Sequence, residues 1–172
     1  MSVVRKTAPP ESGAKAEGRP RLVPEGEAAS RSLETARAKL GGVAAGASEQ
    51  PPGTLVGAKL RDGEQHFGVL LWAEGGQCDI WFDDGLARRA RAGVVYPCAG
   101  PTPDALLRIA SEVRLFSALA EGQRVRWERE TGLEEGRILE KCRYGAIVAA
   151  RGGKVIAVGF RKLWPVGIDA RA

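Results

Sequence analysis

Basic side chains alternate with aromatic rings in the C-terminal third of the chain, and this combination suits contact with an anionic partner. Residues 122–164 hold ten Lys or Arg against five Glu, a net charge of +5. Cations of this kind neutralise phosphates and release counterions, while aromatic rings stack on unpaired bases. The candidate nucleic-acid- or anion-binding residues are Arg124, Arg126, Lys141, Arg143, Arg151, Lys154, Arg161 and Lys162, together with Trp127 and Tyr144.

Two other interpretations of these basic residues remain open. They could form a solvated surface that keeps a small domain soluble, or a basic face that docks on another protein. Residues 54–98 hold five Lys or Arg against six Asp or Glu, a net charge of −1. This near-neutral segment suits a protein contact better than a phosphate backbone.

Side chains able to carry out catalysis or bind a metal are scarce. His66 is the only histidine, and the three cysteines, Cys78, Cys98 and Cys142, have no paired spacing that would suit zinc. Asp83 and Asp84 precede Gly85, which explains them as turn formers. We therefore predict a protein without catalytic residues, metal ligands or cofactor. The cysteine usage fits a reducing compartment, and the absence of an apolar run of membrane-spanning length predicts a cytoplasmic protein with no membrane partner.

The chain contains one stretch twice. Residues 67–97 align without a gap on residues 135–165 when the sequence is shifted by 68 positions. Gly68 then meets Gly136, Ile80 meets Val148, and Tyr96 meets Trp164. Such self-similarity predicts two copies of one small domain.

Short strands separated by tight turns fill both copies. Alternation of apolar and polar residues, as in Cys78–Phe82, is typical of half-buried strands. The predicted strands are 55–60, 67–73, 78–82, 86–91 and 94–96 in the first copy, and 124–128, 137–142, 145–150 and 154–160 in the second. The charged stretch 130–135 is predicted to be a loop. Apolar residues recur at helical spacing over 105–120, which predicts a helix that joins the two copies.

Residues 1–53 hold few large apolar side chains and are predicted to be a disordered tail, with helical propensity over 32–40. That short helix is either transient or a recognition element for a partner. The predicted organisation is a tail over 1–53, a first domain over 54–98, a linker and helix over 99–121, a second domain over 122–166, and a C-terminal tail over 167–172.

The first copy resembles the Tudor-type members of the SH3-like barrels. The resemblance rests on Gly57-x-Lys-Leu, on the strand Gly68-Val-Leu-Leu-Trp72, on Ile80-Trp-Phe-Asp-Asp-Gly85 and on Val94-Val-Tyr-Pro97. It implies a mainly β fold of two tandem small SH3-like barrels joined by one α-helix behind the disordered tail. It also implies a binding module for methylated peptides, nucleic acid, or a polymerase or ribosome surface. An aromatic cage in such a module would use Trp72, Phe82 and Tyr96, unless these rings form the barrel core.

These observations together predict a non-catalytic binding protein. The leading hypothesis is a nucleic-acid- or transcription-associated accessory factor that contacts DNA or RNA through the basic second domain. The alternative is a protein–protein adaptor with no nucleic-acid role, whose tail helix and strand edges recruit another protein.

Overall fold

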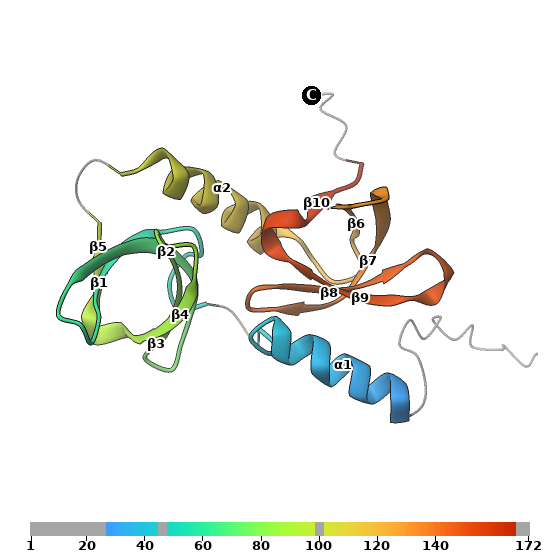
Figure 1. Ribbon diagram of the computed structural model, residues 1–172, viewed down its shortest axis with the longest axis horizontal. Helices are drawn as coiled ribbons and strands as arrows, with labels where there is room; N and C mark the ends of the chain where they lie inside the picture. The colour runs from blue at the N-terminus through green and yellow to red at the C-terminus, as the bar shows by residue number, and fades with distance from the viewer. Residues whose placement is uncertain (1–26, 45–47, 99–101, 168–172) are drawn as a thin grey trace, which may run out of the picture.

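The computed structural model describes residues 27–44, 48–98 and 102–167, and these residues form two antiparallel five-stranded sheets and two α-helices (Figure 1). The predicted mainly β class is thereby confirmed. Neither of the described helices is long and apolar enough to cross a membrane.

The first sheet has the strand order β4-β3-β2-β1-β5. Its strands are β1 (Leu55–Lys59), β2 (Gln65–Glu74), β3 (Gln77–Phe82), β4 (Ala87–Arg91) and β5 (Val95–Pro97), with a short 3-10 turn at Ala92–Val94 before β5. β2 is the longest of them, and a bulge between Leu70 and Trp72 lets it bend. Each strand predicted in this copy corresponds to an observed one.

The second sheet repeats the same connections, with the order β10-β6-β7-β8-β9. Its strands are β6 (Arg124–Arg129), β7 (Gly132–Cys142), β8 (Gly145–Ala150), β9 (Val155–Gly159) and β10 (Trp164–Pro165), with 3-10 turns at Arg151–Gly153 and Phe160–Lys162. The prediction of a charged loop over 130–135 is wrong, because β7 begins at Gly132. The first residues of β7 are charged and exposed or half-buried, so their sequence resembles that of a loop.

The repeat seen in the sequence is also present in the backbone. The bulge between Leu70 and Trp72 recurs between Ile138 and Glu140, 68 positions later. Gly68 and Gly136 also have the same environment, because a Cβ on either would collide with a backbone carbonyl of the neighbouring strand, that of Trp81 or Ala149. The two sheets are therefore built on one plan.

Both sheets curve strongly, as Figure 1 shows, yet neither is closed by hydrogen bonds between its end strands. Among the described residues no pairing joins β4 to β5, or β9 to β10. Each sheet therefore keeps two free edges.

Helix α2 (Asp104–Ala118) lies between the two sheets and shares one core with both, which confirms the predicted connecting helix. Its buried side chains are Leu106, Ile109, Ala110, Val113 and Phe116. They pack with Val69 and Leu71 of the first sheet and with Ile138 and Val148 of the second. A separate core inside the first sheet contains Leu70, Ile80 and Phe82.

The prediction of a disordered tail through residue 53 is wrong for the part that the structure describes. Helix α1 (Glu27–Lys39) packs on the outer face of the second sheet, where Leu33 and Leu40 meet Cys142 and Ile147. Residues 48–53 are held along β2 by hydrogen bonds such as the one from the Gly53 N–H to the Leu70 carbonyl, 2.8 Å long. The apolar face that orders α1 lies about a hundred residues away, so local composition does not reveal it. Residues 1–26, 45–47 and 168–172 of the predicted tails lie outside the described residues.

Candidate functional site

Three of the predicted anion-binding residues are engaged in holding the fold together. The Lys141 Nζ donates hydrogen bonds to the carbonyls of Ser117 and Leu119, at 2.9 and 2.7 Å, and lies 5.0 Å from the centre of the Phe116 ring. It thus caps the C-terminus of α2, where the helix dipole favours a cation. Burial lowers the pKa of Lys141.

Arg143 and Tyr144 lie where the two sheets meet. The Tyr144 hydroxyl donates to the Asp79 carboxylate at 2.9 Å, and the Arg143 guanidinium reaches the Glu74 carboxylate at 3.3 Å and the Gly41 carbonyl at 3.2 Å. Asp79 is 3 % exposed and also accepts two hydrogen bonds from Arg89. Burial, and then the hydrogen bond to Asp79, raise the pKa of Tyr144 to about 12. These side chains join the sheets, and the Tyr144 ring packs against Gly41.

The prediction that Trp127 stacks on a base is also wrong, because its side chain is 2 % exposed and belongs to the core. Arg124 pairs with Glu135 at 2.8 Å. Arg161 pairs with Glu112 at 2.7 Å and covers the Trp81 ring at 5.5 Å. The remaining predicted cations are exposed and have no ion pair within the described part of the chain: Arg126, Arg151, Lys154 and Lys162.

The three rings of the predicted aromatic cage do not assemble. Phe82 is fully buried in the core of the first sheet. Trp72 lines a small cavity against α2 with Val113. Tyr96 lies on β5, with its ring over Gly57 of β1. The alternative interpretation, in which the rings are structural, fits these positions.

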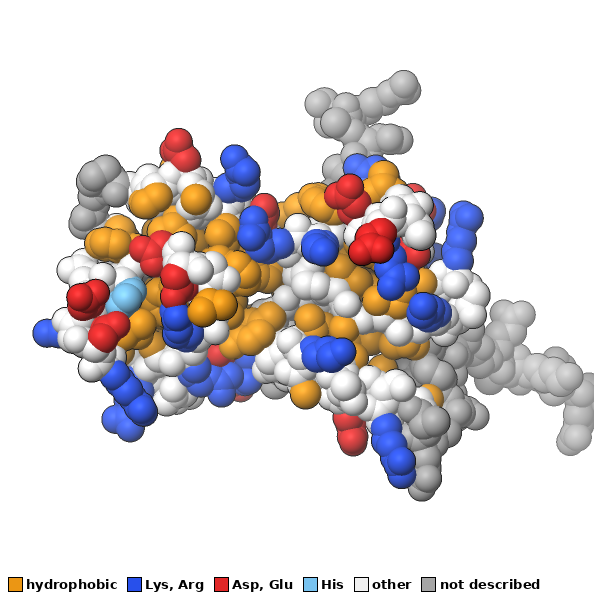
Figure 2. All heavy atoms as spheres, viewed as in Figure 1, with side chains coloured by type: hydrophobic (Ala, Val, Ile, Leu, Met, Phe, Trp, Pro, Cys, Tyr) orange, Lys and Arg blue, Asp and Glu red, His pale blue; other side chains and the backbone are white. Residues whose placement is uncertain are grey.

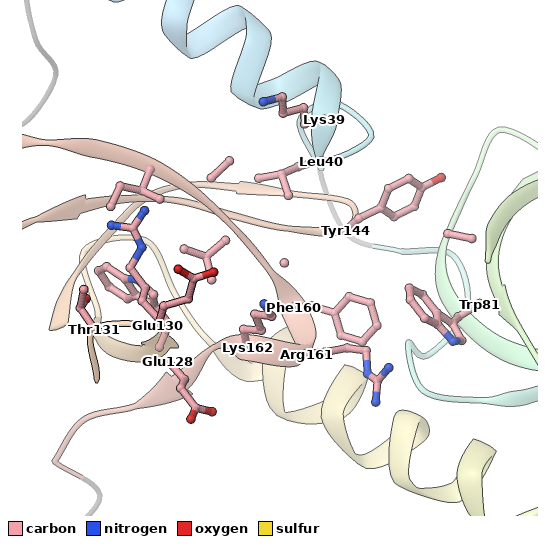
Figure 3. Close-up of a pocket in the computed structure, with 17 residues that line it drawn as sticks. Lys39, Leu40, Trp81, Glu128, Glu130, Thr131, Tyr144, Phe160, Arg161 and Lys162 are labelled. Atoms are coloured by element: carbon pink, nitrogen blue, oxygen red, sulfur yellow. The ribbon is translucent and has the colours of Figure 1, made fainter. Parts of the chain in front are cut away.

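A groove runs beside edge strand β9, between the C-terminal end of α1 and the β6–β7 hairpin. One part has a volume of about 850 Å³, and its walls include Leu40, Trp81, Tyr144 and Phe160. Figure 3 shows the rings of Trp81, Phe160 and Tyr144 toward the first sheet, with Glu128, Glu130 and Thr131 at the opposite end.

The groove continues along α1 into a second part of about 510 Å³. The two parts share Lys39, Arg129, Ile156 and Ala157. They therefore form one groove that follows β9, and we call it the β9 groove.

Cations outnumber acids along the β9 groove. Its walls include Arg31, Lys39, Arg129, Lys154, Arg161 and Lys162. The acids are Glu128 and Glu130, both in the larger part, and none of the described residues that line the part along α1 is acidic. Elsewhere on the face seen in Figure 2 the blue side chains are scattered among red and orange ones and do not gather into one basic surface.

The sequence matches no protein-family model and no curated protein. The Tudor-type relationship therefore stays a prediction.

Sequence reasoning missed the contribution of α1 to the β9 groove. Arg31, Thr35 and Lys39 recur every fourth residue and form one stripe of the helix beside β9. This spacing is visible in the sequence, next to the apolar Leu33, Ala36 and Leu40. Only the docking of α1 on the second sheet, however, brings the stripe alongside Lys154 and Arg129.

Proposed function

We propose that this chain is a non-catalytic adaptor that binds an acidic segment of another protein in the β9 groove. The observation that carries this proposal is the convergence of cations from α1, the β6–β7 hairpin and both ends of β9 on one groove with partly apolar walls. Opposite charges around a concave site guide a partner into place and fix its position. Apolar walls add contact area that a purely electrostatic surface lacks.

A protein partner fits the groove better than nucleic acid does. Stacking on unpaired bases requires ring faces open to solvent. Trp127 is buried, the Tyr144 ring packs against Gly41 with its hydroxyl bonded to Asp79, and Arg161 already covers Trp81. Lys141 and Arg143, which we predicted to contact nucleic acid, are bonded within the fold. The alternative adaptor hypothesis is therefore the one we adopt.

We also propose that both sheets are related to the SH3-like barrels. Two strongly curved, five-stranded antiparallel sheets with identical connections support it. Proteins of that architecture serve as binding modules, and a free sheet edge beside a groove would suit such a role.

The test is binding of a short fluorescein-labelled peptide in which glutamate and valine alternate, measured by fluorescence anisotropy at increasing ionic strength. We expect binding that weakens with salt, because exposed charges are screened. The triple variant Arg31→Glu, Lys39→Glu, Lys154→Glu should lose at least about tenfold in affinity, since three attractions become repulsions.

The matched control is the double variant Lys59→Glu, Arg61→Glu, which reverses two exposed cations of the first sheet outside the β9 groove. It should bind the peptide like the parent. A labelled single-stranded oligodeoxythymidine is titrated in parallel. Tighter binding of this oligonucleotide, lost in the triple variant, would reinstate the nucleic-acid hypothesis, and equal peptide affinity in all variants would refute the adaptor site.

A further inference from the structure

The edge of β9 presents unused backbone hydrogen-bonding groups to the groove. β9 pairs with β8 in an unbroken antiparallel register from Gly145↔Gly159 to Ala149↔Val155. No other described strand lies on its far side. The free edge is therefore continuous over the whole strand.

Hydrogen bonds at the two ends of β9 show which of its residues face that free edge. The Phe160 N–H donates to the Tyr144 carbonyl at 3.0 Å, and the Ala150 N–H donates to the Lys154 carbonyl at 2.8 Å. Alternate residues of an antiparallel strand direct both backbone groups to the same side. Residues 154, 156, 158 and 160 therefore bond to β8, whereas Val155, Ala157 and Gly159 direct their N–H and C=O groups outward.

The equivalent edge in the first sheet has different side chains. β4 corresponds to β9 in the repeat and carries Arg88, Arg89 and Arg91, where β9 has Ile156, Ala157 and Gly159. Charged residues on an edge strand discourage pairing with another chain. β9 itself has no charged side chain, and a Cβ on Gly159 would meet only the Tyr144 carbonyl, 3.9 Å away. The edge of β9 is thus open to a further strand.

The two faces beside this edge also differ. Val155 and Ala157 lie on the face that packs against α1, where Arg31 and Lys39 line the groove. Ile156 and Val158 lie on the opposite face, in the shared core with Trp127 and Phe160. A strand added to β9 would place alternate side chains beside the α1 cations and the others against apolar walls.

We infer that the acidic partner binds by adding an extended strand to β9, with acidic residues alternating with apolar ones. We assign it the antiparallel direction of β8 and β9 and of the other described strand pairs. This mode rests on the proposed function of the β9 groove. In an antiparallel pair the residues opposite Val155, Ala157 and Gly159 exchange both backbone hydrogen bonds and share a face with them. The acidic residues of the ligand therefore supply the N–H groups that bond to β9, and its apolar residues direct theirs away.

The test uses two modified versions of the glutamate–valine peptide, N-methylated either at every glutamate or at every valine. Methylation of the glutamates removes the N–H groups that face β9, so we expect affinity to fall about tenfold or more. Methylation of the valines removes N–H groups that face solvent and should leave affinity within about threefold of the parent peptide. Both peptides carry the same kind of modification, so each controls for the other.

A variant of the protein tests the same edge from the other side. Ala157→Pro removes an outward N–H without breaking the ladder to β8, a position where edge strands tolerate proline. It should bind the unmodified peptide about tenfold or more weakly. Ala157→Ser keeps the N–H and serves as the matched control, and urea unfolding of both variants confirms that they fold.

The other possible outcomes would overturn strand addition, the direction of the added strand, or the proposed function. Equal affinity for the two methylated peptides, or unchanged binding by Ala157→Pro, would overturn strand addition while leaving the groove as the binding site. Loss on methylation of the valines alone would overturn the antiparallel direction. Absence of binding by the unmodified peptide would instead overturn the proposed function.

Discussion

Asp79 is a charged side chain with only 3 % of its surface exposed, and residues from both sheets complete its hydrogen bonds. Arg89 comes from the same sheet, and Tyr144 comes from the other. A buried carboxylate is costly unless it is paired and hydrogen-bonded. Loss of either partner should therefore lower the stability of the protein more than loss of a surface contact would.

Tyr144→Phe should destabilise the protein by about 1.5–3 kcal/mol near neutral pH, because it removes a hydrogen bond to a charged group. The pKa of Tyr144 lies at about 12 in the folded chain against an ordinary value of 10.0. A raised pKa means that the stabilisation is complete below pH 10 and is lost as the pH rises toward 12. Urea unfolding of both proteins across this range should show the difference in stability shrinking.

The control for this change is Tyr96→Phe, which removes a hydroxyl from a more exposed ring and should alter stability by less than about 0.5 kcal/mol at every pH. A constant difference between Tyr144→Phe and the parent from neutral pH to pH 12 would contradict the role given to the Asp79 contact.

The sequence itself contained evidence against the prediction that Trp127 stacks on a base. Val125 and Trp127 alternate with Arg124 and Arg126, and such alternation places Trp127 on the buried face of a strand. Lys141 and Arg143 gave no comparable signal, because the groups that they bond, at the end of α2 and on β2, become neighbours only in the folded chain.

At the scale of elements, helix α1 packs on the outer face of the second sheet and also forms a wall of the β9 groove. It is held by Leu33 and Leu40 and by Arg37, which makes two hydrogen bonds to Glu140 at 2.7 and 2.6 Å. An element with few buried contacts opens at low free energy. Its sequence predicts a helix, but the surface that it covers could not be predicted from residues 27–39.

Leu33→Ala should loosen α1 without unfolding either sheet, because the lost contacts belong to a small cluster apart from the shared core. Hydrogen–deuterium exchange should accelerate in α1 and remain unchanged in β2 and β3. Peptide affinity should also fall, since Arg31 and Lys39 leave the groove with the helix. Ala38→Ser, at an exposed position of the same helix that does not line the groove, is the control. Exchange that accelerates equally across both sheets would contradict a separately docked helix.

For the whole molecule, the shared core is the feature that packs the two copies of one plan against each other. Phe116 of α2 is 7 % exposed and packs in the same cluster as Val69 of the first sheet and Val148 of the second. The duplication, the connecting helix and most strands could be predicted from glycine spacing and apolar periodicity, although the start of β7 and the short β10 could not. The shared core could not, because it depends on how the faces of distant strands meet.

Phe116→Ala should destabilise both sheets together, by about 3–5 kcal/mol. Tryptophan fluorescence and far-ultraviolet circular dichroism should follow one urea transition, shifted to lower concentration, because Trp72 and Trp81 report on the first sheet and Trp127 and Trp164 on the second. Two separated transitions would show that the sheets fold independently.

Helix α1 docks on the second sheet and also lines the groove. Docking of this helix and binding of the proposed ligand are therefore thermodynamically coupled. If the docked helix raises affinity for an acidic strand by some factor, the bound strand must stabilise docking by that same factor. A substitution that frees α1 is therefore expected to weaken binding of the proposed acidic strand without touching β9, and the bound strand is expected to stabilise the docked helix.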